Sequence, residues 1–63
     1  MGMTRQEVIE IMIETVNAYN TNLMRQTGMN QPDILQNIDS QYPALQHMFG
    51  LIYDDLEVKG VFN

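Results

Sequence analysis

Residues 27–33 read TGMNQPD, and they combine the signals that end one α-helix with the signals that begin another. Glycine commonly follows the last turn of a helix because it adopts the left-handed backbone conformation without strain. Asparagine is a favoured N-cap residue, and proline is favoured in the first turn after the cap. We therefore predict that one helix ends before Gly28 and that a second begins after Asn30, with Pro32 in its first turn.

The segment before this turn is predicted to form one long helix, from about Arg5 to Gln26. Thr4 and Glu7 fit the capping-box pattern, in which the N-cap and third helical side chains bond each other's backbone N–H groups. Apolar residues then recur at spacings of three and four, which is the pattern of a helix that packs along one neighbour. This first seam consists of Ile9, Met12, Val16, Tyr19 and Leu23.

A second and narrower apolar stripe lies beside the first seam. It consists of Val8, Ile11, Thr15 and Ala18. This stripe widens the apolar face beyond what a single neighbouring helix covers. Either the helix packs against two partners within the chain, or one edge of it is a surface for another molecule, and the sequence leaves both interpretations open.

The segment after the turn is predicted to contain two helices. The first is a short connecting helix at about residues 31–38, and its apolar face consists of Ile34, Leu35 and Ile38. Ser40 is a further N-cap candidate, and Pro43 suits the opening turn of another helix, at about residues 43–57. The apolar residues of this last helix again recur at spacings of three and four. This second seam consists of Tyr42, Leu45, Phe49, Ile52 and Leu56.

The end of the chain allows different interpretations. Gly50, which costs a helix about 1 kcal/mol relative to alanine, either permits the close approach of a neighbouring segment or lies on a solvated face. After the helix we predict an extended tail of residues 58–63, whose Val61 and Phe62 cover apolar surface. The alternative is that Gly50 ends the helix and that residues 51–62 form a strand, although a lone hairpin is marginally stable.

Together these elements predict an all-α fold in one small domain of residues 1–63: an antiparallel helical hairpin with a short connecting helix. A chain of this size buries only about 60% of the surface that it exposes when unfolded. Such small domains depend on disulfides, a metal or a partner. The sequence contains no cysteine and one histidine. We therefore expect neither disulfides nor a metal or other cofactor, and we predict that the hairpin assembles as a dimeric bundle, a homo-oligomer.

The charge of the chain restricts the partners that it can bind. Three basic residues stand against eight acidic ones, a formal net charge of −5. This balance opposes direct binding to nucleic acid or to an anionic membrane, because both surfaces are negative. No apolar run approaches the roughly 18 residues of a membrane-spanning helix, and no secretory signal is visible. We predict a cytoplasmic protein.

The residues that could carry chemistry do not form a catalytic pattern. His47 is the only histidine. Ser40 and Asp54 each lie seven positions from it, two helical turns or about 10 Å, which is beyond hydrogen-bond reach. The acidic group of Asp54, Asp55 and Glu57 lies near a helix C-terminus, where negative charge opposes the helix dipole. We therefore predict that the chain is not an enzyme, and that these acids serve solubility or meet a basic partner.

The function that this sequence favours is a small, acidic, non-catalytic protein–protein interaction module, working as a homo-oligomer. It would be an adaptor, regulator or inhibitor of the kind common in bacteria and their phages. Interfaces concentrate their energy in buried apolar and aromatic anchors surrounded by a polar rim. The predicted interface residues are Val8, Ile11, Phe49, Ile52, Tyr53 and Leu56 as anchors, and Asp54 and Asp55 as the acidic rim toward a partner with a basic surface. The alternative is an acidic mimic of nucleic acid that inhibits a DNA- or RNA-binding protein.

Overall fold

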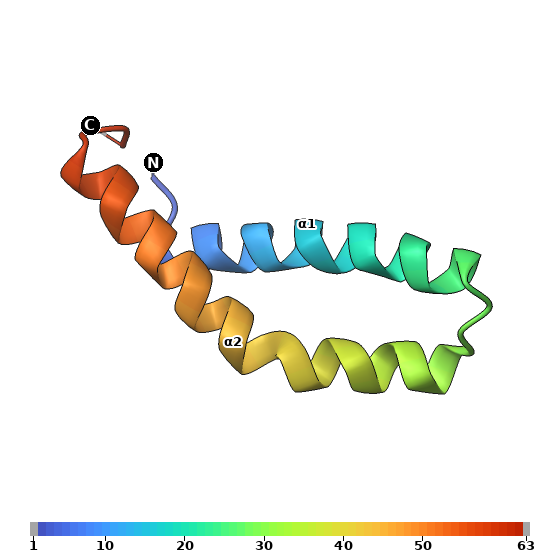
Figure 1. Cartoon of the computed structure of the whole chain (residues 1–63). Helices are drawn as coiled ribbons and strands as arrows, with labels where there is room; N and C mark the ends of the chain where they lie inside the picture. Colours follow the sequence, from blue (N-terminus) through green and yellow to red (C-terminus); the bar gives the residue numbers. More distant parts are fainter. Residues whose placement is uncertain (1, 63) are drawn as a thin grey trace.

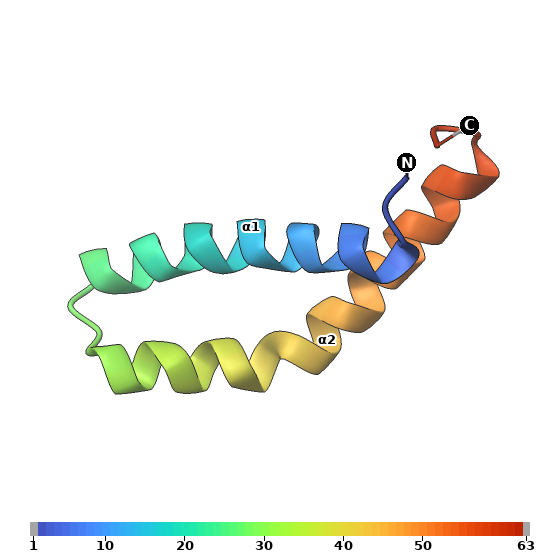
Figure 2. The ribbon, with the colours of Figure 1, turned by 180° about the vertical axis from the view of Figure 1, so that it is seen from behind.

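The computed structural model describes residues 2–62 and contains two α-helices, α1 (Arg5–Gln26) and α2 (Gln31–Val58). They run antiparallel and are joined by a short turn, while both ends of the described segment lie at the opposite end of the hairpin (Figure 1). The second half of α2 crosses the beginning of α1, and Figure 2 shows the same crossing from behind. No strand is present among the described residues. The predicted all-α hairpin of two packed helices is confirmed.

The turn has the capping geometry that its sequence predicts. Gly28 has a φ of +86°, and its N–H donates to the carbonyl oxygen of Arg25 at 3.0 Å. The N–H of Met29 donates to the carbonyl of Met24 at 3.0 Å, which completes a Schellman motif. On the other side of the turn, the Asn30 side chain accepts a hydrogen bond from the N–H of Asp33 at 3.0 Å.

Helix α1 begins as its capping box predicts. The Glu7 N–H donates to the Thr4 hydroxyl oxygen at 3.1 Å, and the Thr4 N–H donates to the Glu7 carboxylate at 2.9 Å. These reciprocal bonds satisfy two of the N–H groups that have no partner inside the helix. They also hold the pKa of the Glu7 carboxyl below its usual value, chiefly through the hydrogen bond from the Thr4 backbone.

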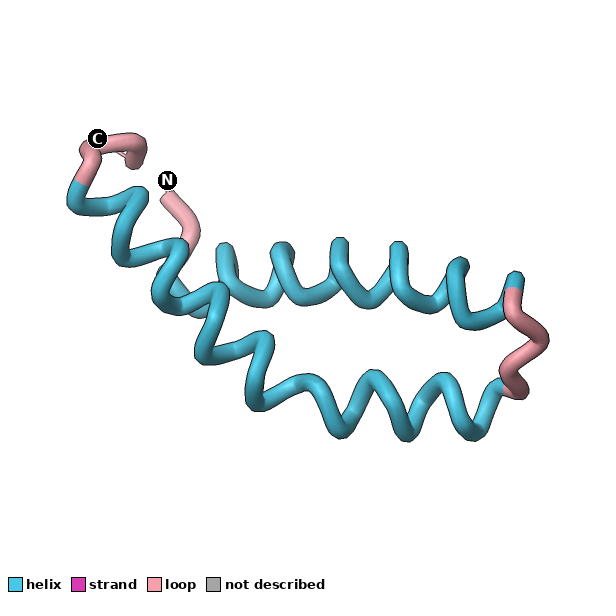
Figure 3. Tube along the Cα trace, viewed as in Figure 1, coloured by secondary structure: helices cyan, strands magenta, loops and turns pink. Residues whose placement is uncertain are grey.

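The two helices predicted after the turn are one helix. Residues 31–38 do not form a separate connecting helix, because α2 continues without interruption from Gln31 to Val58 (Figure 3). Ser40 is not an N-cap, since its hydroxyl donates to the carbonyl of Asn37 at 2.8 Å inside the helix. Pro43 lies within α2. A proline ring crowds the preceding turn and removes one N–H donor, which bends a helix without necessarily ending it. Helix α2 bends midway along its length, in the yellow stretch of Figure 1 that contains Pro43.

The core lies where the second half of α2 crosses α1. It consists of Ile9, Ile13, Leu45, Phe49 and Tyr53. Within each helix these residues are four positions apart, and such rows pack together when helices cross steeply, at about 50°. The predicted seams assumed the shallower crossing of a coiled coil, and they are wrong in part: Ile13 was not included, and Tyr19 and Leu23 are exposed. Toward the loop Ile34 is buried, and the side-chain oxygen of Asn17 is buried without a hydrogen-bond partner among the described residues.

The tail is a turn and not the extended segment predicted for residues 58–63. Val58 is the last residue of α2. Gly60 has a φ of +78°, and its N–H donates to the carbonyl of Glu57 at 3.0 Å. This turn brings Phe62 back onto Tyr53, where the rings stack with their centroids 4.7 Å apart. Phe62 therefore covers apolar surface as predicted, while Val61 stays exposed and residue 63 lies outside the described part. The strand alternative for residues 51–62 is wrong.

Candidate interaction surface

Polar contacts tie the two helices together along one side of the core. The Gln6 and Gln46 side-chain amides bond each other at 2.7 and 3.2 Å, and the Tyr42 hydroxyl donates to the Glu10 carboxylate. That hydrogen bond raises the pKa of the Tyr42 hydroxyl. The resulting polar edge consists of Gln6, Glu10, Tyr42 and Gln46.

The other side of the core carries apolar side chains. Helical spacing places them across the buried rows from the polar edge. In α1, Val8, Met12 and Val16 are half-buried against the core. Tyr19 and Leu23 continue the same side toward the loop and are 66% and 43% exposed, and in α2 Met48 and Ile52 are 45% and 41% exposed. We call this set the apolar edge: Val8, Met12, Val16, Tyr19, Leu23, Met48 and Ile52.

The predicted interface residues divide between this surface and the interior. Phe49 and Tyr53 are each 8% exposed and belong to the chain's own core, so they are not available as anchors for a partner. Val8 and Leu56 are half-buried, while Ile11 and Ile52 are exposed. A pattern of apolar spacing marks which residues are covered by something, but it does not tell a neighbour in the same chain from another molecule. Tyr19, Leu23 and Met48 are among the exposed apolar residues that the sequence did not assign to an interface.

Both acids of the predicted rim have cation partners within the chain. The Arg5 guanidinium donates to both Asp54 carboxylate oxygens, at 3.0 and 3.2 Å, and this hydrogen bonding lowers the pKa of the Asp54 carboxyl. Asp55 pairs with Lys59, the residue that follows the end of α2. All four side chains are at least half-exposed, so dissolved salt weakens the attraction within both ion pairs.

Arg5 also explains why Gly50 is buried. Its guanidinium lies over the ring of Tyr53, 5.8 Å from the centroid, and approaches the Gly50 carbonyl oxygen at 3.4 Å. A Cβ atom at position 50 would lie 2.9 Å from Arg5 Nη2. Of the two interpretations of Gly50, the structure therefore shows close approach, by a side chain from the far end of the sequence.

His47 is exposed, and its imidazole makes no hydrogen bond to another residue in the range 2–62. Because α2 is continuous, Ser40 and Asp54 remain about two turns away on either side of it. Across the described part of the chain, no three His, Asp or Glu side chains gather closely enough to hold a metal ion. Neither helix described is long and apolar enough to cross a membrane.

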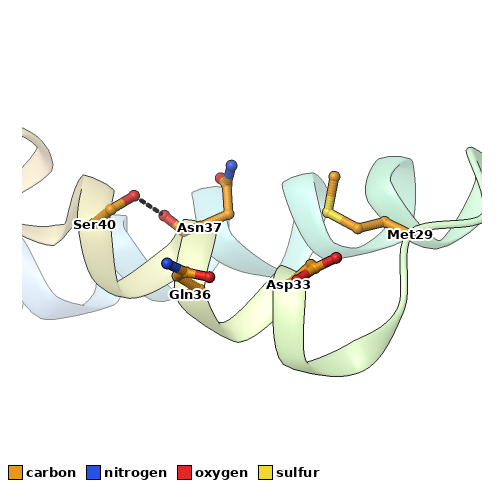
Figure 4. Close-up of a pocket in the computed structure, with 5 residues that line it drawn as sticks. All are labelled: Met29, Asp33, Gln36, Asn37 and Ser40. Atoms are coloured by element: carbon orange, nitrogen blue, oxygen red, sulfur yellow. Dashed lines mark hydrogen bonds between the residues drawn. The ribbon is translucent and has the colours of Figure 1, made fainter.

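The hollows in the surface of the described residues include two near the ends of the helices. One of about 410 Å³ lies along the start of α2, with Asp33 as its only titratable lining group (Figure 4). It is lined by Met29, Asp33, Gln36, Asn37 and Ser40. The other, of about 290 Å³, lies between the two ends of the described chain and is lined by Gly2, Met3, Val8, Tyr53 and Phe62. The first hollow offers one carboxyl group and the Ser40 hydroxyl, with no histidine, lysine or arginine among its lining residues. The second is lined by no acid, histidine or cation, so neither hollow holds a catalytic constellation.

No known protein family, characterised protein or solved structure matches this chain. Its function is therefore inferred from the geometry of its own residues. The apolar edge is one group of its exposed apolar side chains; others, such as Leu35, Leu51 and Val58, lie outside it.

Proposed function

We propose that this chain is a small, acidic, non-catalytic protein–protein interaction module that works as a homo-oligomer in the cytoplasm. The observation that carries the proposal is the apolar edge. Soluble monomers scatter single apolar residues over their surface, whereas aligned exposed side chains typically mark an interaction site. On α1 they continue the row of half-buried residues Val8, Met12 and Val16 at helical spacing, so a partner helix could cover that row.

The surface and shape of the chain support this proposal. Its accessible surface is 4707 Å², whereas a compact monomer of this mass exposes about 4,200 Å². Its radius of gyration is 14.1 Å, whereas a compact domain of this length has about 10.6 Å. The excess is what two long helices with a small core between them leave uncovered. Association would bury it and add the stability that a core of five side chains lacks.

Absolute mass in solution tests the proposal. We expect light scattering at micromolar concentration to give a multiple of the 7.3 kDa chain mass. A stable monomer throughout the micromolar range would contradict the homo-oligomer. A matched pair of variants locates the surface: Leu23→Ser on the apolar edge should weaken association, and Gln26→Ser on the exposed end of the same helix should not.

The alternative, an acidic mimic of nucleic acid, receives less support. Such a mimic needs carboxylates free to meet a basic cleft, but Asp54 and Asp55 each already have a cation beside them. The exposed acids that remain, and that could form a rim toward a basic partner, are Glu7, Glu14, Asp33, Asp39 and Glu57. Under the alternative, replacing Asp54 and Asp55 by asparagine would weaken binding to that partner more strongly at low salt than at high salt.

A further inference from the structure

We infer that the fold contains a conformational device: the loop half of the hairpin opens as a unit while the core half stays folded, and Pro43 sets the boundary in α2. The loop half is residues 17–41, and the core half is residues 5–16 and 42–58. Opening means that the loop half loses its helical hydrogen bonds and its contacts between the helices. The inference goes beyond the proposed function and does not depend on it, because it concerns a single copy of the chain.

The buried contacts between the helices are concentrated in the core half. All five members of the core belong to it, and so do the bonds that join the start of α1 to α2, such as the one between Gln6 and Gln46 at 2.7 Å. In the loop half, Arg25 and Gln31 bond each other at 3.4 Å, beside the turn. Ile34 is the only buried residue of this half, every residue of which the structure describes, and it is not a member of the core. Regions with so few buried contacts open at a lower free energy than the core of the same protein.

The covered face of α1 becomes polar in the loop half. Its half-buried residues there are Asn17, Asn20, Thr21 and Met24. Asparagine and threonine are weak helix formers, so this part of α1 depends on its packing. The side-chain oxygen of Asn17 is nevertheless buried without a hydrogen-bond partner among the described residues. Opening gives that oxygen access to water, and the unmet hydrogen bond therefore favours the open form.

Pro43 allows the second half of α2 to remain a helix by itself. Proline has no N–H, so α2 lacks the bond that a residue at position 43 would donate to the Asp39 carbonyl. Proline is favoured as the first residue of a helix, where an N–H has no partner in any case. Tyr42, which precedes it, is biased toward an extended conformation. The helix start that the sequence predicts near Pro43 is thus the one that the open form uses.

Hydrogen exchange of the backbone amides, followed by NMR at low urea concentrations, tests the device. Amides that open together share one free energy of exchange and one dependence on urea. We expect residues 21–25 and 35–42 to form one such group. Their amides should exchange about tenfold or more faster than those of Ile13 and Phe49, with a weaker dependence on urea. A single free energy and slope for the whole hairpin would overturn the device, and so would rates that fall steadily with distance from the turn, which indicate fraying.

The position of the boundary tests the role of Pro43. In a helix that starts at Pro43, the N–H groups of Ala44 and Leu45 have no acceptor, whereas the N–H of Gln46 keeps the Tyr42 carbonyl. Ala44 and Leu45 should therefore exchange with the loop half, and Gln46 with the core half. A boundary elsewhere in α2 would overturn the role assigned to Pro43.

A mild core variant separates the two halves. Ile9 is fully buried, and Ile9→Val should make the amides of the core half exchange about fivefold faster. The amides of the loop half should keep their rates, because residue 9 remains packed in the open form. Equal acceleration in both halves would show that the hairpin opens only as a whole, and would overturn the inference.

A matched pair of variants tests the contribution of Asn17. Asn17→Leu replaces the unpartnered oxygen by a side chain of similar shape and should slow exchange in the loop half about tenfold. Asn22→Leu makes the same change at an exposed position of the same helix, and should slow it only about twofold through helix propensity. Circular dichroism checks that both variants remain helical. Equal slowing by the two variants would overturn the role assigned to the Asn17 oxygen.

Discussion

At the scale of single residues, one arginine organises the crossing of the helices. Arg5, in the first turn of α1, contacts Gly50, Tyr53 and Asp54 on α2. The absence of a side chain at Gly50 lets the guanidinium lie against the α2 backbone. The sequence raised close approach at Gly50 as one of two interpretations. It could not identify Arg5 as the neighbour, because the two residues are 45 positions apart and meet only through the bend in α2.

Replacing Gly50 by alanine should raise the free energy of unfolding, but less than helix propensity alone predicts. Alanine in a helix interior is favoured over glycine by about 1 kcal/mol. The new Cβ, however, would displace Arg5, whose flexible end can move aside. In the Arg5→Ala background the gain should therefore approach the full amount. Urea denaturation compares glycine with alanine at position 50 in the two backgrounds, with arginine and with alanine at position 5, at one protein concentration. Equal gains in the free energy of unfolding would show that Arg5 does not contact position 50 in solution.

The Asp54 carboxylate should make folding sensitive to acid. Its pKa is lowered by the hydrogen bond from Arg5, so the folded chain favours the charged form. The stability that this bond contributes is present above the usual pKa of aspartate and is lost as the pH falls through the lower pKa of the folded chain. We expect Asp54→Asn to flatten the decline in thermal stability between pH 5 and about pH 2. Arg5→Ala should flatten this decline by the same amount. If the double variant lost stability less steeply with falling pH than either single variant, the two effects would not both come from the bond between Arg5 and Asp54.

At the scale of elements, the helix ends could be predicted from the sequence, but the continuity of α2 could not. Caps act within four or five residues, and so Thr4, Gly28 and Asn30 signal their helix ends locally. Ser40 and Pro43 resemble a helix start equally well. What decides between a break and a bend is the packing on both sides of Pro43. Tyr42 and Leu45 hold α2 against α1 there, through Glu10 and the core respectively.

A comparison of two substitutions distinguishes a continuous α2 from two helices. Asn30→Ala removes a true N-cap and should lower the free energy of unfolding by about 1 kcal/mol. Ser40→Ala should leave it unchanged or raise it by up to about 0.5 kcal/mol, because alanine is a better residue than serine inside a helix. Chemical denaturation of the two variants measures both effects. A loss at Ser40 as large as that at Asn30 would mean that a second helix begins there.

At the scale of the whole molecule, the heptad seams of the sequence and the core of the structure do not coincide. Ile9, Leu45 and Phe49 belong to both, but Tyr19 and Leu23 are exposed. The bend in α2 turns its second half into a steep crossing, which uses rows four residues apart. Of the other seam residues, Met12, Val16 and Leu56 are half-buried, and those left exposed are Tyr19, Leu23, Tyr42 and Ile52. The sequence predicted that these residues should be buried, and a single copy of the chain does not bury them.

If a second copy buries them, thermal stability should depend on concentration. For a dimer of two 63-residue chains, each tenfold dilution should lower Tm by about 5 °C. Differential scanning calorimetry from 10 to 1000 µM measures this shift. A Tm that does not change on dilution would indicate a monomer.

The short distance between the ends of the described chain has a consequence for engineering. Gly2, Met3 and Phe62 line one hollow, so a brief Gly/Ser bridge could join the two ends and new ends could be opened in the turn at residues 27–30. This circular permutant would keep both helices and their crossing while moving its ends to the former loop. A reporter fused to the natural chain and one fused to the permutant would then leave the hairpin in opposite directions, at the two ends of its 43 Å length.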